Sequence, residues 1–569
     1  MTLTDAGLAA ALGHPGLALF VGAAAVALLR GRLRGAAALL APAAAALLLW
    51  QLPDGISWRG HLLGLDVAPL APDRMSRLFA TIFALMAFAG ALFALNQKSR
   101  MELPAAFVYA GSAIGVVLAG DLVTVFMFWE LMAIGSTLVL WSEGGEAAYR
   151  AARRYLAIHL LGGVLLLAGI AGHVSQTGST GFTALALDGP AHWLILVAVL
   201  LNAGAPPLSA WLPDAYPEAS WSGMVFLSAF TTKTAVYVLM RGFAGESVLI
   251  GIGLYMVFYG IVYALLENDM RRILAYSIVN QVGFMVAGIG IGTPLAINGA
   301  AAHAFAHILY KALLLMSAGS VLYMTGRRKC TDLGGLFQSM PITAACGIVG
   351  ALAISSFPLT SGFVSKSMVT QAAADGHLFA VWMALAAASA GVFLHAGIKF
   401  PWFVFFQKDS GLRPPDPPWS MRLAMLLLAV LCVGLGIFYE PLYALLPHPV
   451  RYHPYTGGHV VSQLQLLLFS GLAFFVMLSW LKRTLTVTLD TDWVYRVALD
   501  HVVTAGAALL RQVLASASRA WGAALHVTGE RVRAWHAPGG PLVGPWSTGL
   551  MALWTMLLLL ALLVSGYFW

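Results

Sequence analysis

The stretches NAGAPP at residues 202–207 and FPLTSG at residues 357–362 interrupt two long apolar segments, and they decide the fold. Each falls in the fourth member of a set of five consecutive apolar segments. Because five is an odd number, the second set would cross a membrane in the opposite sense to the first. Matched interruptions in two halves of a chain are typical of transport sites built on broken helices. We predict two inverted five-helix repeats broken at Pro206, Pro207 and Pro358, with a chance coincidence of membrane prolines as the alternative.

The composition excludes an ordinary soluble protein. Of 569 residues, 60% are hydrophobic and only 10% are charged, whereas a soluble protein carries about 25% charged residues. A water-facing surface cannot be built from that supply, so we predict a protein that crosses the bilayer many times. The formal net charge of +8 does not indicate a nucleic-acid partner, because the basic residues form short clusters between apolar runs.

Apolar windows of about 20 residues, the length that crosses the hydrocarbon core, predict about 16 transmembrane helices in an all-α fold. A strand barrel is excluded because the apolar runs are continuous rather than alternating. The windows lie near residues 14–31, 34–52, 74–97, 103–120, 121–141, 152–174, 191–210, 220–241, 247–266, 273–292, 297–324, 341–372, 378–407, 419–440, 459–481 and 547–568.

Basic residues in the short loops follow only odd-numbered segments. They are Arg30, Arg32, Arg34, Lys98, Arg100, Arg150, Arg153, Arg154, Arg271, Arg272, Arg327, Arg328 and Lys329. The loops after even-numbered segments are poor in lysine and arginine, and residues 175–190 contain none. By the positive-inside rule the basic loops face the cytoplasm. Both chain termini are then expected outside.

The same pattern divides the chain into five parts. These are N-terminal helices at 1–102, a first repeat at 103–241, a second repeat at 247–407, additional helices at 408–483 and a C-terminal extension at 484–569. In the extension, arginines recur among apolar residues before a final apolar span, which is typical of an amphipathic helix on a membrane or protein surface. We expect it to lie in the membrane plane, with the last helix against a partner protein of the same complex. The alternative is a helix folded back onto its own bundle.

Two charged residues lie in the middle of predicted helices of the first repeat. Glu130 lies in FWELM (128–132) and Lys233 in AFTTKTA (229–235). A charge at the centre of a bilayer is costly, so such a residue is a functional candidate. We predict that Glu130 and Lys233 carry protons and approach one another directly or through water. A structural hydrogen bond or a static ion pair is the alternative.

His303, His307 and Lys311 recur every four residues, which places them on one helix face. No nearby cysteine or carboxylate completes a metal site, and groups that each take and give a proton suit a relay. We predict a proton relay along this face, over metal binding or simple packing. Lys366 follows the second helix break and Lys399 lies near the end of its segment, where reaching the membrane surface is an equal alternative to a relay role.

Other chemistry has no motif in this sequence. Nucleotide loops, zinc-protease motifs and nucleophile elbows do not occur, and Cys330, Cys346 and Cys432 lack metal-ligand spacing. His159 and His173 are expected to be packed hydrogen-bonding groups. We therefore expect no metal and no cofactor.

With these residues in view, the sequence resembles the antiporter-like membrane subunits shared by respiratory complex I and Mrp-type sodium/proton antiporters. The resemblance covers about residues 100–410, and the runs around 202–218 and 231–241 are most similar to the D-type subunits of Mrp antiporters. The stretches that carry it are FWELM (128–132), WLPDA (211–215), LSAFTTKT (227–234), LAYS (274–277), the His303/His307/Lys311 face with Ala312 and Leu313, and FPLTSGFVSK (357–366).

The resemblance implies a fourteen-helix core and a horizontal proton path at mid-membrane depth. It assigns Glu130 and Lys233 to carboxylate and lysine positions, the His303/His307/Lys311 face to the central connection and Lys366 to the terminal group. One position departs from the family. Asn202 stands where the family usually has a lysine, and an asparagine does not titrate. Either Glu130 pairs with Lys233 instead, or this half conducts without the usual switch.

The resemblance implies a proton-translocating subunit of an Mrp-type antiporter in a bacterial-type cell membrane. Its partners would be other membrane subunits, and Na+ or K+ would be the exchanged cation. Such a subunit is a transporter component without a catalytic site of its own. Two other memberships stay open: a proton-pumping (translocase) subunit of complex I or a related redox enzyme, and the membrane subunit of a bicarbonate-uptake complex. A transporter that works alone is disfavoured by the resemblance.

Overall fold

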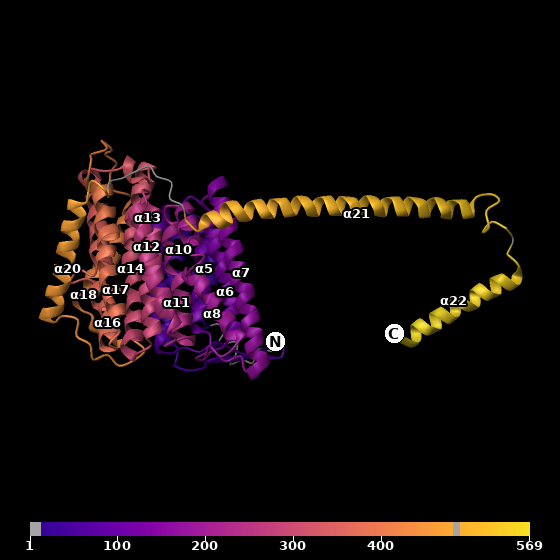
Figure 1. Ribbon diagram of the computed structural model, residues 1–569, viewed down its shortest axis with the longest axis horizontal. Helices are drawn as coiled ribbons and strands as arrows, with labels where there is room; N and C mark the ends of the chain where they lie inside the picture. The colour runs from indigo at the N-terminus through magenta and orange to yellow at the C-terminus, as the bar shows by residue number, and fades with distance from the viewer. Residues whose placement is uncertain (1–12, 482–489, 545, 569) are drawn as a thin grey trace. The chain divides into compact units, whose positions relative to one another are not determined.

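The computed structural model describes residues 13–481, 490–544 and 546–568. The chain divides into two compact units, Met1–Asp492 and Trp493–Trp569. The first unit is a bundle of helices that run side by side, with α7 near one end and α20 at the other (Figure 1).

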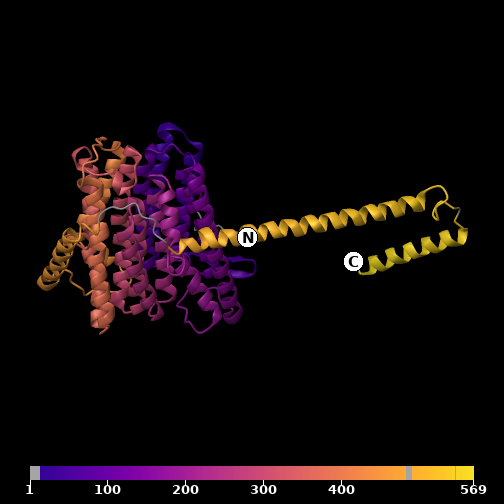
Figure 2. The ribbon, with the colours of Figure 1, turned by 45° about the horizontal axis from the view of Figure 1, so that its top comes forward.

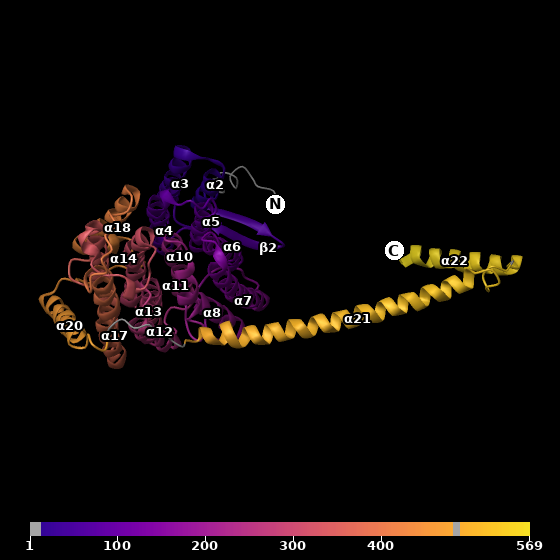
Figure 3. The same ribbon diagram turned by 90° about the horizontal axis from the view of Figure 1, so that it is seen from above.

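The first unit starts with helices α2 (Pro15–Leu28) and α3 (Gly31–Gln51) and continues, after a hairpin, into α4 (Arg74–Phe93). The antiparallel hairpin of β1 (Trp58–Leu62) and β2 (Leu65–Leu70) lies at the edge of the bundle (Figure 3). Leu63 and Gly64 at its turn have positive φ angles of 51° and 80°, as a two-residue turn requires. The all-α prediction missed this hairpin because its strands are too short to stand out from a loop.

The first predicted set of five segments contains the expected break. Helix α8 ends at Ala203 and is capped by Gly204, which adopts the left-handed conformation, and Pro206 and Pro207 precede the short helix α9. A further break at Phe230 separates α10 from α11 and was not predicted. The helices of this set are α5 (Glu102–Leu118), α6 (Leu122–Trp141), α7 (Gly145–Thr177), α8 (Pro190–Ala203), α9 (Trp211–Ala215), α10 (Gly223–Ala229) and α11 (Thr231–Gly242).

The second set is also interrupted where predicted, because Pro358 lies between α15 and α16. A side chain at Gly362 would overlap the Ala353 carbonyl, so the two half-helices approach closely there. The last helix of this set continues as two π-helical stretches. The elements are α12 (Val248–Leu266), α13 (Met270–Ile291), α14 (Pro294–Thr325), α15 (Pro341–Ile354), α16 (Ser361–Asp375), α17 (Phe379–Val392), η5 (Phe393–Lys399) and η6 (Trp402–Phe406).

The rest of the first unit consists of α18 (Trp419–Ile437), α19 (Glu440–Ala444) and α20 (Gly457–Val476). Short 3-10 turns η1 (Ala94–Asn96), η2 (Tyr216–Glu218), η3 (Cys330–Asp332) and η4 (Leu336–Gln338) join helices elsewhere.

The second unit contains η7 (Val494–Ala498), α21 (Leu499–His536) and α22 (Thr548–Phe568). Helix α21 is a single amphipathic helix of 38 residues, about 57 Å long at 1.5 Å per residue, and Figure 2 shows it uninterrupted. Residues 484–489, where the extension was predicted to begin, lie outside the described residues.

Within the described residues, 12 helices are long and apolar enough to cross a membrane. Four shorter apolar helices, Pro15–Leu28, Glu102–Leu118, Pro190–Ala203 and Pro341–Ile354, lie at other predicted spans. The many-helix membrane class is confirmed. The count of 16 and the inverted repeat stay predictions.

The basic loops gather on one face of the first unit, here called the basic face. Arg34 donates to the Ser99 carbonyl at 3.1 Å, which joins the first and third predicted loops. Arg154 forms a two-point ion pair with Asp214, with both N–O distances at 2.8 Å. The prediction that these loops share a side is consistent with these contacts, whereas the orientation of the face in a cell stays a prediction.

Candidate functional site

Five of the predicted site residues form a buried basic row on helices α11, α14 and α16. Each is at most 2% exposed, although a lysine or histidine is rarely buried without a charged partner. Within the part of the chain that the structure describes, none of the five forms an ion pair with a carboxylate. The members of the row are Lys233, His303, His307, Lys311 and Lys366.

Lys233 lies just after the break at Phe230. Its ammonium donates to the Ser228 carbonyl at 2.7 Å and to the Thr232 hydroxyl at 3.1 Å. A regular helix would use the Ser228 carbonyl for its own ladder, but a break frees backbone groups for other partners. The unpredicted break therefore supplies an acceptor to a buried cation.

A tyrosine from α5 holds this break open. The Tyr109 hydroxyl accepts from the Thr231 amide at 2.9 Å, lies 2.5 Å from the Thr231 hydroxyl and donates to the Leu227 carbonyl at 3.3 Å. In an uninterrupted helix, the Thr231 amide would donate directly to the Leu227 carbonyl. The phenol replaces that backbone bond, and α5 thereby fixes where α11 begins.

The predicted face of α14 meets a polar face of α13. Lys311 donates to the Ser277 hydroxyl at 2.8 Å, and His303 Nε2 lies 3.1 Å from the Gln281 side-chain oxygen. The Tyr310 hydroxyl donates to the same Gln281 oxygen at 3.2 Å. Ser277 and Gln281 are four residues apart, so one stripe of α13 serves two members of the row.

Two members of the row have side-chain nitrogens without a hydrogen-bond partner among the described residues. Both ring nitrogens of His307 are buried in this condition, as is the ammonium of Lys366. The Lys366 ammonium lies 4.2 Å from the centre of the Phe284 ring, a cation–π contact. Buried polar groups are almost always hydrogen-bonded, so these unpaired nitrogens mark positions where a mobile proton or water can be accommodated.

Lys366 also lines a cavity of about 410 Å³ between α16, α17 and α20, with hydroxyls of Ser367 and Ser389 in its wall. Tyr452 and His459 line both this cavity and a larger one of about 790 Å³. The larger cavity is lined by Thr293, which directly precedes α14. This cavity therefore lies at the end of the bundle opposite the basic face. The row thus ends beside polar space that leads to the surface.

Lys399 occupies a different environment. Its ammonium donates to the carbonyls of Leu265 at 2.5 Å, Glu267 at 2.6 Å and Ala264 at 3.2 Å, at the C-terminal end of α12. A cation there satisfies carbonyls that the helix leaves free and opposes the helix dipole. This geometry is a helix cap, so it favours neither the relay role nor a side chain reaching the membrane surface.

Glu130 lies on α6 against the glycine pair Gly162-Gly163 of α7. A side chain at position 163 would overlap the Glu130 Oε1 atom. That oxygen is buried without a hydrogen-bond partner among the described residues. Lys233 donates to Ser228 and Thr232, and no direct hydrogen bond joins it to Glu130 among the described residues. The predicted approach of the two residues through water stays a prediction.

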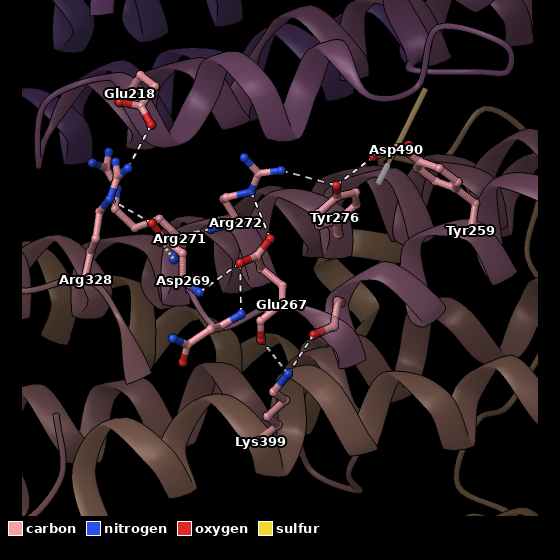
Figure 4. A network of polar contacts seen from close by, with 12 residues as sticks. Glu218, Tyr259, Glu267, Asp269, Arg271, Arg272, Tyr276, Arg328, Lys399 and Asp490 are labelled. Carbon is pink, nitrogen blue, oxygen red and sulfur yellow. Dashed lines mark hydrogen bonds and ion pairs between the residues drawn. The ribbon is translucent and has the colours of Figure 1, made fainter. Parts of the chain in front are cut away.

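A second polar network crosses the basic face (Figure 4). Arg328 binds Glu218 at 2.9 Å and Asp269 at 2.8 Å. Arg271, which follows the Asp269 cap of α13, donates to the carbonyls of Ala219 and Ser220 at 2.8 and 2.7 Å. Burial raises the pKa of the Asp269 carboxyl, and the neighbouring guanidinium of Arg328 opposes that rise. The network ties α13 and the end of α14 to the loop that precedes α10.

The same network reaches the end of the first unit. Arg272 binds Glu267 at 2.9 Å, and the hydroxyls of Tyr259 and Tyr276 both donate to Asp490 Oδ2 at 2.6 Å (Figure 4). These two hydrogen bonds to one carboxylate oxygen fix the Asp490 side chain against α12 and α13.

Across residues 13–481, 490–544 and 546–568, no group of three histidine, cysteine, aspartate or glutamate side chains is arranged to hold a metal ion. Sequence reasoning missed Tyr109, Ser277, Gln281 and Phe284. Ser277 and Gln281 carry a recognisable signal, because polar residues four apart in an apolar helix share one face. Tyr109 and Phe284 carry none, since aromatic residues are common in such helices.

A family model described as "NADH:quinone oxidoreductase/Mrp antiporter, TM" matches residues 119–392. The matched range contains Glu130, the whole buried basic row and both proline breaks.

Three curated relatives are similar to the chain. The A/B-type component of a probable K(+)/H(+) antiporter of Rhizobium meliloti is 31% identical over 66% of this chain, which spans only 40% of that relative's length. The D-type component of the Na(+)/H(+) antiporter of Alkalihalophilus pseudofirmus is 29% identical, over 67% of this chain and 83% of the relative. The N-type component of the NADH-quinone oxidoreductase of Desulforudis audaxviator is 28% identical, over 72% and 89%.

Two solved structures share the fold. A chain of the Mrp complex from Dietzia sp. DQ12-45-1b superposes with a TM-score of 0.64 at 22% identity, covering 78% of this chain and 94% of that chain. A chain of the membrane-bound sulfane sulfur reductase, an archaeal respiratory membrane complex, gives 0.70 at 25% identity, covering 97% and 100%.

Proposed function

Since the chain belongs to the family of antiporter-like membrane subunits shared by Mrp-type antiporters and respiratory complex I, we propose that it moves protons through the membrane along the buried basic row. Glu130 delivers protons to the row, and Lys366 releases them into the adjoining cavity. Lys399 is left out of the path because its ammonium donates to the carbonyls of Ala264 and Leu265 in α12 and of Glu267, the residue after α12.

One observation carries this proposal: among the described residues, the row has buried nitrogens without protein partners, at His307 and Lys366, and no counter-charge. A static structural role would pair such groups, because an unpaired buried polar group costs about 1–3 kcal/mol. Groups that exchange protons need unpaired sites at some stage of the cycle. Members of the row are close enough to influence one another, since the ring centroids of His303 and His307 are 6.2 Å apart, so a proton placed on one group changes the electrostatic potential at the next.

The Lys366 end of the proposed path lies beside a cavity. The cavity at Lys366 leads to the face opposite the basic face. By the positive-inside rule we assign the basic face to the cytoplasm and the cavity to the outside of a bacterial-type cell membrane, which places both termini outside.

We further propose membership of an Mrp-type monovalent cation/proton antiporter complex, with Na+ or K+ as the exchanged cation. The names of two relatives, components of a K(+)/H(+) and a Na(+)/H(+) antiporter, support this assignment. The second candidate is a proton-pumping subunit of a respiratory redox complex. It is favoured by the similarity to the sulfane sulfur reductase chain, which covers 97% of this chain and therefore includes residues of the second unit.

Two measurements test these proposals. Glu130→Gln and Lys233→Gln in the full-length chain should each abolish proton movement in vesicles that contain the assembled complex, while Lys98→Gln, in a loop, should leave it unchanged. Undiminished proton movement in both interior variants would refute the path. Mass spectrometry of proteins that co-purify with the chain separates the two memberships, since small antiporter subunits support one and redox subunits the other.

A further inference from the structure

The cluster around the Gly162-Gly163 pair of α7 contains three buried polar atoms without partners among the described residues: Glu130 Oε1, Asn202 Oδ1 and His159 Nε2. Unpaired groups of this kind are individually uncommon in a folded protein. Three of them beside one pair of glycines therefore require an explanation.

The geometry places these groups around one small space. A side chain at Gly163 would overlap Glu130 Oε1, and a side chain at Gly162 would come to 3.4 Å from Asn202 Oδ1. His159 lies one helical turn before Gly163 on the same face of α7. The glycines keep this space open between Glu130 on α6, Asn202 on α8 and His159.

The His159 ring is fixed by aromatic neighbours. Its centroid lies 4.0 Å from that of Tyr155 and 4.7 Å from that of Trp211, whose indole donates to the Leu201 carbonyl at 3.0 Å. His173 on the same helix differs, because its Nδ1 lies 2.9 Å from His192 Nε2. Of the two histidines of α7, His159 is therefore the one whose Nε2 atom is buried without a hydrogen-bond partner among the described residues.

We propose that His159 accepts the proton of Glu130 and passes it toward the row, which makes it a further relay residue in the first half of the path. This inference rests on the proposed function. In the transfer, the O–H bond of the Glu130 carboxyl breaks and an N–H bond forms at His159 Nε2, through a bridging water. The products are a carboxylate and an imidazolium held close together. Asn202 can orient that water but cannot take the proton, because an amide does not titrate.

Hydroxyl side chains lie near both His159 and the row. Tyr155, on which His159 packs, has its ring 6.5 Å from that of Tyr216, and its hydroxyl donates to that of Ser136 at 2.9 Å. Tyr109 lies 2.5 Å from the Thr231 hydroxyl. Thr232, the next residue in the chain, accepts from Lys233 through its hydroxyl, so hydroxyl groups also lie beside the first member of the row.

The test uses the assembled complex in vesicles, with proton movement followed by a pH-sensitive dye. His159→Gln, which keeps a polar side chain of similar size, should lower the rate at least tenfold, and His173→Gln should not change it. Adding Asn202→Lys to the His159→Gln chain should restore the rate, with its pH dependence moved to higher pH because an amine holds its proton more tightly than an imidazole.

The outcomes separate this inference from the proposed function. A normal rate in His159→Gln together with loss in Glu130→Gln overturns the role of His159 and leaves the path intact, whereas normal rates in Glu130→Gln and Lys233→Gln remove the path itself. Loss in His159→Gln without rescue by Asn202→Lys, in a protein of unchanged melting temperature, indicates a structural histidine and also overturns the inference. If the His159→Gln protein does not assemble, the Asn202→Lys single variant is the test. An unchanged pH dependence of proton movement in that variant contradicts a titrating site at this cluster.

Discussion

Replacing Tyr109 by phenylalanine removes one oxygen atom from the break between α10 and α11. Tyr109 is 0% exposed, and its hydroxyl pairs with the Thr231 amide at 2.9 Å. Without that oxygen, the amide has either no acceptor or the Leu227 carbonyl four residues earlier. An unpaired buried amide costs about 1–3 kcal/mol. Closing the helix instead recovers the bond but rotates Lys233 away from the Ser228 carbonyl.

Both outcomes are measurable in the purified complex. If the break persists, we expect the free energy of unfolding to fall by about 1–3 kcal/mol, seen as a lower melting temperature in detergent. If the helix closes, stability is retained and proton movement falls, because Lys233 has lost its acceptor. The control is Tyr323→Phe, since no hydrogen bond to the Tyr323 hydroxyl occurs among the described residues. Wild-type stability and wild-type proton movement together in Tyr109→Phe would refute the role of the phenol.

Three other perturbations follow from the structure. Gly163→Ala inserts a methyl group where Glu130 Oε1 lies, so proton movement should fall as in Glu130→Gln, and a normal rate would show that the carboxyl moves freely. Lys399→Met removes the cap of α12 and should lower the free energy of unfolding by about 1–3 kcal/mol while proton movement persists; loss of movement at unchanged stability would return Lys399 to the path. A chain ending at Asp492 should still insert into the membrane, because the first unit is compact by itself. It should lose its partner proteins on purification, and normal co-purification would contradict the expectation that the C-terminal extension lies against a partner protein.

The sequence was most informative at titratable residues inside apolar segments, because such residues are costly in a membrane. A lysine or histidine inside an apolar run is conspicuous, so Lys233 and the His303/His307/Lys311 face could be found without a structure. Pro206, Pro207 and Pro358 likewise mark breaks directly, because proline cannot continue the helical ladder.

Features that depend on another helix could not be found in this way. The break at Phe230 has no proline or glycine signal and depends on Tyr109, more than a hundred residues earlier. The role of Lys399 depends on where α12 ends in space. Lys233 was expected to approach Glu130 directly or through water, but its described hydrogen bonds go to the Ser228 carbonyl and the Thr232 hydroxyl, and the first of these acceptors is free only because of the unpredicted break.

The lack of counter-charges along the described row has a consequence for ion selectivity. A sodium ion that followed the buried basic row would pass ammonium groups without a paired carboxylate to replace its water shell. Two like charges about 6 Å apart repel by about 3 kcal/mol at an effective dielectric constant of about 20, and the row presents several such groups in succession. A proton escapes this barrier, since it travels as the charge of the side chains themselves. Under the proposed function, the row would therefore act as an electrostatic filter that rejects metal cations, and a cation exchanged for protons would cross the membrane along a route lined by other residues.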